Sequence, residues 1–211
     1  MPKTFRALIL LVSACLLMSS PQARAEPQTI LALGDSLTAG LGLDPSQAFP
    51  AKLEAALKAK GHDVTVINAG VSGDTVAQGA ARLDWSLTDD VDAVIVELGA
   101  NDALRGLDPA QADAAFSEIL TKLSSRNLPA LVAGMRAPPN LGPDYAQAFE
   151  AMYRKLEGRP GVVVYPFFLD GVAADPKLNQ DDGLHPTAEG VDVIVARMLP
   201  AVERLLALTK K

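Results

Sequence analysis

Residues 29–40 read TILALGDSLTAG, and this stretch decides how the rest of the chain is interpreted. The apolar, β-branched run at 29–33 predicts a short strand, and Gly34 ends it. Asp35 and Ser36 then stand side by side in the turn that leaves the strand. A turn needs glycine but has no need of this serine, so the position of Ser36 suggests a chemical role.

Four more apolar runs share the character of the first, since each is short and nearly continuous rather than alternating. Such runs indicate strands buried on both faces of a parallel sheet. They lie at residues 64–67, 93–98, 130–132 and 162–165.

Segments with helical spacing alternate with these strands. They cover residues 46–60, 75–87, 109–126, 144–156 and 187–208. Gly61 reads as a helix stop, and Asp108 followed by Pro109 reads as a cap with proline at the first helical position. The repeated β-then-α order predicts an α/β fold, with a parallel sheet covered by helices on both faces. Sites in such sheets gather beyond the carboxyl ends of the strands.

The first 25 residues have the pattern of a secretory signal peptide. Lys3 and Arg6 precede an apolar run at 7–18, and a small-residue cleavage site ends at Ala25. The run is shorter than the about 20 residues of a membrane span. We therefore expect cleavage after Ala25, a single domain over residues 26–211, and a periplasmic or secreted protein. The alternative is a lipoprotein anchored at Cys15, because residues 12–15 resemble a lipobox, although the apolar run continues past the cysteine.

Composition narrows the classes of partner. Cys15 is the only cysteine, so the mature domain would contain neither disulfides nor thiolate metal sites. The chain has 25 acidic and 19 basic residues, and three of the basic ones lie in the predicted leader. This acidic balance argues against nucleic acids and anionic membrane surfaces as partners. We expect a monomer whose mature chain does not insert stably into a membrane.

The opening stretch has other possible interpretations. Asp35 or Ser36 alone could simply cap a helix. A P-loop is excluded because no lysine follows until Lys52, and a dinucleotide fingerprint is excluded because its third glycine is replaced by Pro45. Thr38 stands where the G-x-S-x-G nucleophile elbow would have its second glycine.

A second candidate lies near the end of the chain, where residues 180–186 read QDDGLHP. Asp182 and His185 are three positions apart, a spacing that brings both side chains to one side of a turn or first helical turn. In a serine hydrolase an acid orients the imidazole, which takes the proton of the serine. Asp181 is a second possible acid at a spacing of four. A capped helix start with an incidental histidine is the alternative.

The loops after the second and third predicted strands supply possible oxyanion donors. They read NAGVSGDT at 68–75 and LGANDALRG at 98–106. Gly73 can bring its backbone N–H close because it lacks a Cβ, and Asn101 carries an amide that can donate. Ordinary turn chemistry would explain each residue separately. All these loops fall at one predicted edge of the sheet, so a single cleft explains them more economically.

The same residues resemble a known family, the GDSL-type esterases or SGNH hydrolases. The matching blocks are GDSLTAG at 34–40, GAND at 99–102 and DGLHP at 182–186, with SGDT at 72–75 between them. They look most like the secreted bacterial branch of arylesterases, acyl-CoA thioesterases and lysophospholipases. The resemblance implies a flavodoxin-like three-layer sandwich with a parallel sheet of about five strands.

The resemblance also implies roles for individual residues. Ser36 would be the nucleophile, His185 the general base and Asp182 the acid that orients it. The backbone N–H groups of Ser36 and Gly73 and the side chain of Asn101 would form the oxyanion hole. The expected reaction is cleavage of carboxylic esters or thioesters of acyl chains through an acyl-enzyme, and no metal or organic cofactor is implied.

Two other functions remain open at this point: a carbohydrate O-acetylesterase, and a binding protein that holds an acyl or glycan ligand without turnover. The scarcity of aromatic residues, with Trp85 the only tryptophan, favours acyl chains over sugars. Residues 135–142, MRAPPNLG, resemble a loop on the substrate side. Nearby Met and Phe residues are candidates for an acyl pocket, but such residues more often form core. They are Met135, Phe149, Met152, Phe167 and Phe168.

Overall fold

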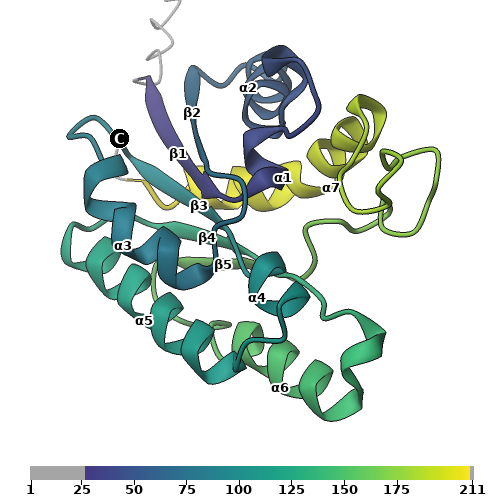
Figure 1. Ribbon diagram of the computed structural model, residues 1–211. Helices are drawn as coiled ribbons and strands as arrows, with labels where there is room; N and C mark the ends of the chain where they lie inside the picture. Colours follow the sequence, from purple (N-terminus) through teal and green to yellow (C-terminus); the bar gives the residue numbers. More distant parts are fainter. Residues whose placement is uncertain (1–26, 210–211) are drawn as a thin grey trace, which may run out of the picture.

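The computed structural model describes residues 27–209, which form a five-stranded sheet between two layers of helices (Figure 1). The strand order is β2-β1-β3-β4-β5, and every neighbouring pair is parallel. The predicted parallel α/β sheet is therefore confirmed. The strands are β1 (Gln28–Gly34), β2 (Val64–Gly70), β3 (Ala93–Glu97), β4 (Ala130–Ala133) and β5 (Val162–Tyr165). The predicted signal peptide, its cleavage site at Ala25 and the alternative anchor at Cys15 lie outside the described residues.

The helices divide between the two faces of the sheet. Helices α2 (Phe49–Ala59) and α7 (Ala188–Leu206) pack together on one face, near the short α1 (Ser36–Ala39), as Figure 1 shows. Helices α3 (Val76–Ser86), α5 (Pro109–Ser125) and α6 (Pro143–Arg154) cover the other face. Helix α4 (Ala100–Leu104) and two 3₁₀ turns, Pro45–Gln47 and Pro139–Leu141, complete the chain.

Local sequence signals explain where the longer helices begin. Thr75 and Gln78 form a reciprocal capping box at α3. The Asp108 side chain accepts a hydrogen bond at the start of α5, where proline occupies the first helical position as predicted. Thr187 caps α7 by accepting from the N–H of Gly190. These caps satisfy N–H groups that the first turn of a helix leaves without partners.

The strands differ in burial according to their place in the sheet. All five residues of the central β3 are buried, whereas the four residues of the edge strand β5 are only half-buried. In the other edge strand, β2, buried and exposed residues alternate at first. The prediction that all five strands are buried on both faces is therefore wrong for the edges, because the helical layers cover the centre of the sheet more completely.

The site forms where the strand order changes direction. Strand β1 lies between β2 and β3, so the loops leaving these three strands meet at one edge. Gly34 and Gly70 are required there because a Cβ on Gly34 would overlap the hydroxyl of Thr38, and one on Gly70 would overlap the backbone of Ala39. The two glycines thus allow α1 to lie directly against the strand ends.

Candidate active site

A chain of hydrogen bonds joins three of the predicted residues. Ser36 is the first residue of α1, and its Oγ lies 2.8 Å from Nε2 of His185. The other ring nitrogen of His185, Nδ1, lies 2.5 Å from Oδ2 of Asp182. Ser36 follows β1, whereas Asp182 and His185 belong to the turn before α7. The fold therefore brings together residues that are about 150 positions apart in sequence.

The turn that carries Asp182 and His185 fixes the orientation of the acid. Oδ1 of Asp182 accepts from the backbone N–H groups of His185, at 3.0 Å, and Leu184, at 2.9 Å. The backbone N–H of His185, its ring and the N–H of Leu184 lower the pKa of Asp182 from 3.8 to about 2. Asp182 is therefore an ionised acceptor that holds the hydrogen of the imidazole on Nδ1.

The structure does not contain the alternatives to the pairing of Asp182 with His185. Helix α7 starts at Ala188 and is capped by Thr187, so Asp182 does not begin a helix. Asp181 makes no hydrogen bond to His185 in the described residues, and its side chain belongs to the exposed part of the turn. The structure thus places Asp182, and not Asp181, on the imidazole.

Two backbone N–H groups at this edge are left without an intramolecular acceptor. In residues 27–209, neither the N–H of Ser36 nor that of Gly73 donates a hydrogen bond to the protein. Next to Ser36, the N–H of Leu37 is already bound by the side chain of Asp35 at 3.0 Å. Gly73 has a φ of +89°, a conformation that favours glycine. Both N–H groups are accordingly available to an external acceptor.

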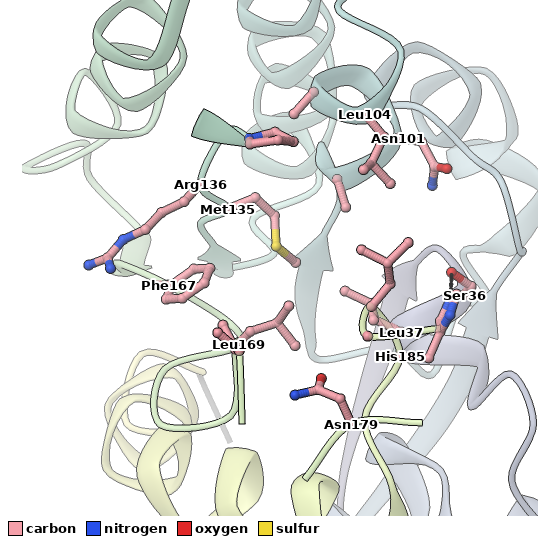
Figure 2. Close-up of a pocket in the computed structure, with 17 residues that line it drawn as sticks. Ser36, Leu37, Asn101, Leu104, Met135, Arg136, Phe167, Leu169, Asn179 and His185 are labelled. Atoms are coloured by element: carbon pink, nitrogen blue, oxygen red, sulfur yellow. Dashed lines mark hydrogen bonds between the residues drawn. The ribbon is translucent and has the colours of Figure 1, made fainter. Parts of the chain in front are cut away.

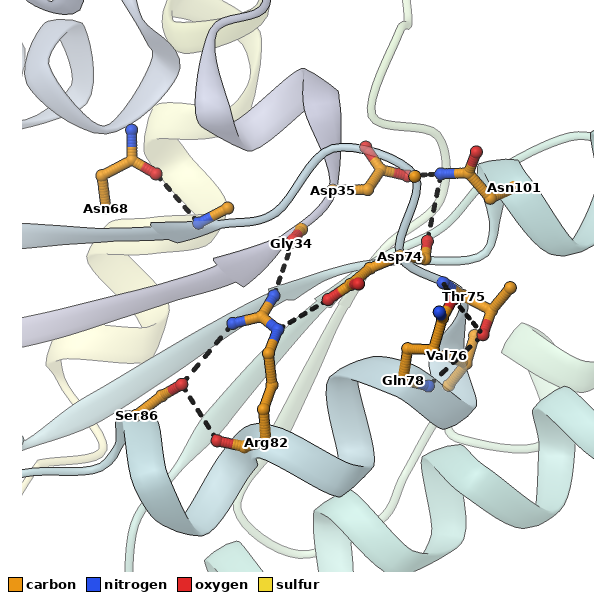
Figure 3. A network of polar contacts seen from close by, with 12 residues as sticks. Gly34, Asp35, Asn68, Asp74, Thr75, Val76, Gln78, Arg82, Ser86 and Asn101 are labelled. Atoms are coloured by element: carbon orange, nitrogen blue, oxygen red, sulfur yellow. Dashed lines mark hydrogen bonds and ion pairs between the residues drawn. The ribbon is translucent and has the colours of Figure 1, made fainter.

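Asn101 reaches the same edge, but its amide is already engaged (Figure 3). Its Nδ2 donates to Oδ2 of Asp35 at 3.1 Å and to the backbone oxygen of Asp74 at 3.0 Å. The sequence identified Asn101 as a possible donor, and the structure shows its Nδ2 donating to two acceptors within the protein. A substrate oxygen must share or displace one of these two hydrogen bonds. Asp35, which the sequence treated only as a possible cap, orients the amide.

Helix α4 fastens the loop that contains Gly73. Arg105, just after α4, donates from Nη2 to the backbone oxygen of Gly73 at 2.7 Å. Asp102 accepts from the N–H of Val76 at 3.0 Å, where the loop enters α3. These contacts and the amide of Asn101 mean that three side chains from one short segment hold successive parts of the loop.

An arginine from α3 holds the same loop from the other side (Figure 3). Nε of Arg82 lies 2.6 Å from Oδ2 of Asp74, and its Nη2 donates to the backbone oxygen of Gly34 at 2.9 Å. Arg82 therefore ties the loop after β2 to the end of β1, two residues before Ser36.

A mainly apolar cavity of about 280 Å³ opens beside Ser36. In Figure 2, Ser36 and His185 stand at one end of it, and Arg136 stands at the opposite end with its guanidinium turned away from the cavity. Arg136 stacks on the ring of Phe167, 4.5 Å from the ring centre. Met135 and Pro138, from the segment predicted to lie on the substrate side, also line the cavity.

The candidate pocket residues named from the sequence separate into two groups. Met135 and Phe167 line the cavity. Phe149, Met152 and Phe168 are instead buried in the core. Position on the chain alone could not distinguish them, because both groups are apolar and lie close together in sequence.

Two features are absent from the described part of the chain: a cluster of metal ligands and a membrane-spanning helix. Residues 27–209 contain no cluster of three or more His, Cys, Asp or Glu side chains suited to a metal ion. In the same residues, no helix combines the length and apolar character that crossing a membrane requires.

The fold and the site together define a class of protein. A five-stranded parallel sheet between helical layers, with a serine, a histidine and a carboxylate hydrogen-bonded at its carboxyl edge, is the arrangement of the SGNH hydrolases, which are carboxylic ester hydrolases. The sequence profile of the GDSL-like Lipase/Acylhydrolase family matches residues 32–193, and the chain belongs to this family.

Individual relatives agree with this assignment. Esterase TesA of Pseudomonas aeruginosa is 38% identical over 198 residues, which cover 93% of this chain and 98% of the relative. Thioesterase 1/protease 1/lysophospholipase L1 of Escherichia coli strain K12 is 39% identical over 183 residues, which cover 86% of each protein. The crystal structure of AlinE4, an SGNH-hydrolase family esterase, matches with a TM-score of 0.71 and 48% identity over 86% of this chain and 97% of that one.

Proposed function

We propose that this protein hydrolyses carboxylic esters and thioesters of acyl chains through a covalent acyl-enzyme. Ser36 is the nucleophile, His185 the general base, and Asp182 the acid that orients the base. The observation that carries this proposal is the continuous hydrogen-bond chain from Ser36 Oγ through the imidazole to Asp182, placed at the end of an apolar cavity.

The first half of the reaction follows from the protonation pattern of this chain. Ionised Asp182 keeps a hydrogen on Nδ1, so the lone pair of Nε2 faces Ser36 Oγ at 2.8 Å. As Oγ attacks the carbonyl carbon of the substrate, Nε2 takes the hydroxyl proton and the ring becomes positively charged. Asp182 stabilises that charge without itself taking up the proton.

The negative charge that develops on the carbonyl oxygen needs donors already in place. The N–H groups of Ser36 and Gly73 supply two of them, because both lack an acceptor within the described protein. The amide of Asn101 supplies a third once it shares a hydrogen that it now gives to Asp35 or Asp74. Collapse of the intermediate releases the alcohol or thiol, which leaves with the proton from His185.

The second half of the reaction repeats these steps with water. His185 removes a proton from a water molecule as the water attacks the acyl carbon, and the bond from that carbon to Ser36 Oγ breaks. Ser36 recovers its proton from the imidazole, and the carboxylic acid leaves. None of these steps calls for a metal or an organic cofactor.

The cavity supports acyl chains as the substrate class. Its walls are mostly aliphatic and aromatic, which suits a hydrocarbon chain better than a sugar. The names of the relatives, an esterase, an arylesterase and a thioesterase/lysophospholipase, agree with small acyl substrates. A carbohydrate O-acetylesterase and a non-catalytic binding protein are the alternatives that the experiment must separate.

The test is hydrolysis of p-nitrophenyl esters from acetyl to palmitoyl, together with an acyl thioester, a lysophospholipid and an acetylated xylan. The wild type is compared with Ser36→Ala and with Ser125→Ala, a control at the exposed end of α5. We expect the wild type and the control to be equally active and Ser36→Ala to lose at least about 10³ in kcat. Equal activity of all three would refute the role of Ser36. An inert wild type would favour the binding protein, and turnover of acetylated xylan alone the carbohydrate esterase.

We also propose that residues 1–25 are a signal peptide, and that the domain over residues 26–211 acts as a monomer in the periplasm or outside the cell. The pattern of basic residues, apolar run and small residues before Ala25 supports this proposal. Mass spectrometry of the exported protein would test it, because cleavage after Ala25 predicts a mature chain that begins at Glu26.

A further inference from the structure

A carboxyl group lies beneath the nucleophile, and the reaction described above does not use it. Glu97 is the last residue of β3 and has no solvent exposure. Its Oε2 accepts a hydrogen bond of 2.6 Å from the hydroxyl of Thr38, whereas its Oε1 has no hydrogen-bond partner. A buried charged oxygen without a donor is costly, so each such group requires an explanation.

A second buried carboxyl lies close to the first. Asp35 also has no exposure, but both of its oxygens are bound, one by the N–H of Leu37 and the other by Asn101. Two adjacent buried carboxyls do not both ionise at low cost. Because the donors are gathered on Asp35, the single negative charge is placed there, and Glu97 keeps a proton.

The charges around the two carboxyls agree with a negative charge on Asp35 and a proton on Glu97. Burial raises the pKa of Asp35 to about 6, and burial together with the charge of Asp35 raises the pKa of Glu97 well above its usual value. His185 acts on Asp35 in the opposite direction, and Asp74, paired with Arg82, adds a weaker repulsion. The phenol of Tyr153 also lies near Glu97, and its own pKa is raised mainly by burial.

The side chain that Glu97 binds belongs to α1. The hydroxyl that donates to Oε2 of Glu97 belongs to Thr38, the third of the four residues of α1 and two positions after Ser36. Helix α1 has only four residues and cannot maintain its own geometry. The N–H of Leu37 is bound by Asp35 and the hydroxyl of Thr38 by Glu97, so both residues that follow Ser36 are tied to buried carboxyls, while the N–H of Ser36 has no acceptor in residues 27–209.

We propose that Glu97 is a positioning residue of the active site: as a neutral acid on the neighbouring strand it accepts the hydroxyl of Thr38 in α1 and thereby holds the backbone and hydroxyl of Ser36 in place. This inference rests on the proposed function of Ser36. It assigns a role to a residue that touches neither the substrate nor the imidazole.

The test compares substitutions that keep or remove the neutral group. Glu97→Gln preserves a neutral side chain that can accept from Thr38, so we expect kcat within about threefold of wild type and an unshifted pH profile. Glu97→Ala removes the acceptor of the Thr38 hydroxyl, and we expect kcat to fall at least about tenfold with KM within about threefold, because small misplacements of a reacting group are costly. Thr38→Val, which removes the hydroxyl, should lower kcat in the same way and serves if Glu97→Ala does not fold. Glu150→Gln, on the exposed side of α6, is the matched control.

A spectroscopic measurement is independent of turnover. The infrared band of a neutral carboxylic acid should be present at pH 8 in the wild type and in Ser36→Ala, and absent in Glu97→Gln. If the proposed function failed, the band would persist and only the kinetic results would change. The inference is overturned if the wild type lacks the band. It is also overturned if Glu97→Gln loses more than tenfold in kcat or shifts the pH profile to lower pH. The third contrary outcome is full kcat in both Glu97→Ala and Thr38→Val.

Discussion

Asp182→Asn tests the hydrogen-bond chain most sharply, because it exchanges one oxygen for an N–H group and leaves the turn in place. Oδ1 of the new side chain still accepts from the N–H groups of Leu184 and His185. The new amide nitrogen replaces Oδ2 and donates to Nδ1, which must then give up its hydrogen. The ring hydrogen moves to Nε2, which faces Ser36 and can no longer accept the proton of the serine.

The size of the effect depends on how well water can replace the acid. In serine proteases with a buried acid, this exchange costs about 10⁴ in kcat. Here the side chain of Asp182 is 45% exposed and that of His185 is 17% exposed. Water therefore offers the ring a partial substitute, and we expect kcat to fall by between about 10² and about 10⁴, with KM within about threefold of wild type.

Asp181→Asn is the matched control, since Asp181 neighbours Asp182 in the same exposed turn and makes no hydrogen bond to the imidazole. Hydrolysis of p-nitrophenyl butyrate by the three proteins would be measured across the pH range. The pKa of Asp182 is lowered to about 2, so the wild type should lose activity in mild acid through groups other than this carboxylate. Full activity in Asp182→Asn, or an equal loss in both variants, would refute the assignment of Asp182.

Two further predictions concern the loop and the buried carboxyl. Arg105→Ala removes a hydrogen bond of 2.7 Å to the backbone oxygen of Gly73, and the loss of such a bond costs about 1 kcal/mol, so kcat should fall about fivefold. Arg126→Ala breaks a surface ion pair and should leave kcat unchanged. Steady-state kinetics that do not separate the two variants would contradict the role of Arg105 in holding the Gly73 loop. The pKa of Glu97 is raised, so the folded state binds the proton of this carboxyl more tightly than the unfolded chain does. The contribution of this proton to stability is full below the unfolded pKa of about 4.3. That contribution is lost as the pH rises through the folded pKa. Urea unfolding should therefore show the stability of Glu97→Gln rising relative to wild type with increasing pH, and a constant difference would count against this ionisation behaviour.

The sequence was sufficient to predict the layers of the fold, because continuous β-branched runs and amphipathic segments have periods that can be counted. Helices α1 and α4 were missed because their four and five residues are too few for a period to show. The helix predicted from residue 46 begins instead at Phe49, after a 3₁₀ turn over Pro45–Gln47.

The sequence predicts which residues meet in the site, but it predicts less well which hydrogen bonds they form. Motif spacing placed Ser36, Asp182 and His185 at one edge of the sheet, but the choice of Asp182 over Asp181 depends on the path of a turn. The occupied amide of Asn101 depends on hydrogen bonds to Asp35 and Asp74, which are far away in sequence. Glu97 was read as part of an apolar strand. An acid at the end of a fully buried run was the signal that could have drawn attention to it.

Part of the cavity wall comes from segments that contain none of the proposed catalytic residues. Met135 and Pro138 follow β4, and Phe167 and Leu169 follow β5. No hydrogen bond within residues 27–209 joins these four residues to Ser36, Asp182 or His185. Substitutions in these two segments can therefore change the shape of the cavity while the hydrogen bonds that join Ser36, His185 and Asp182 stay as they are.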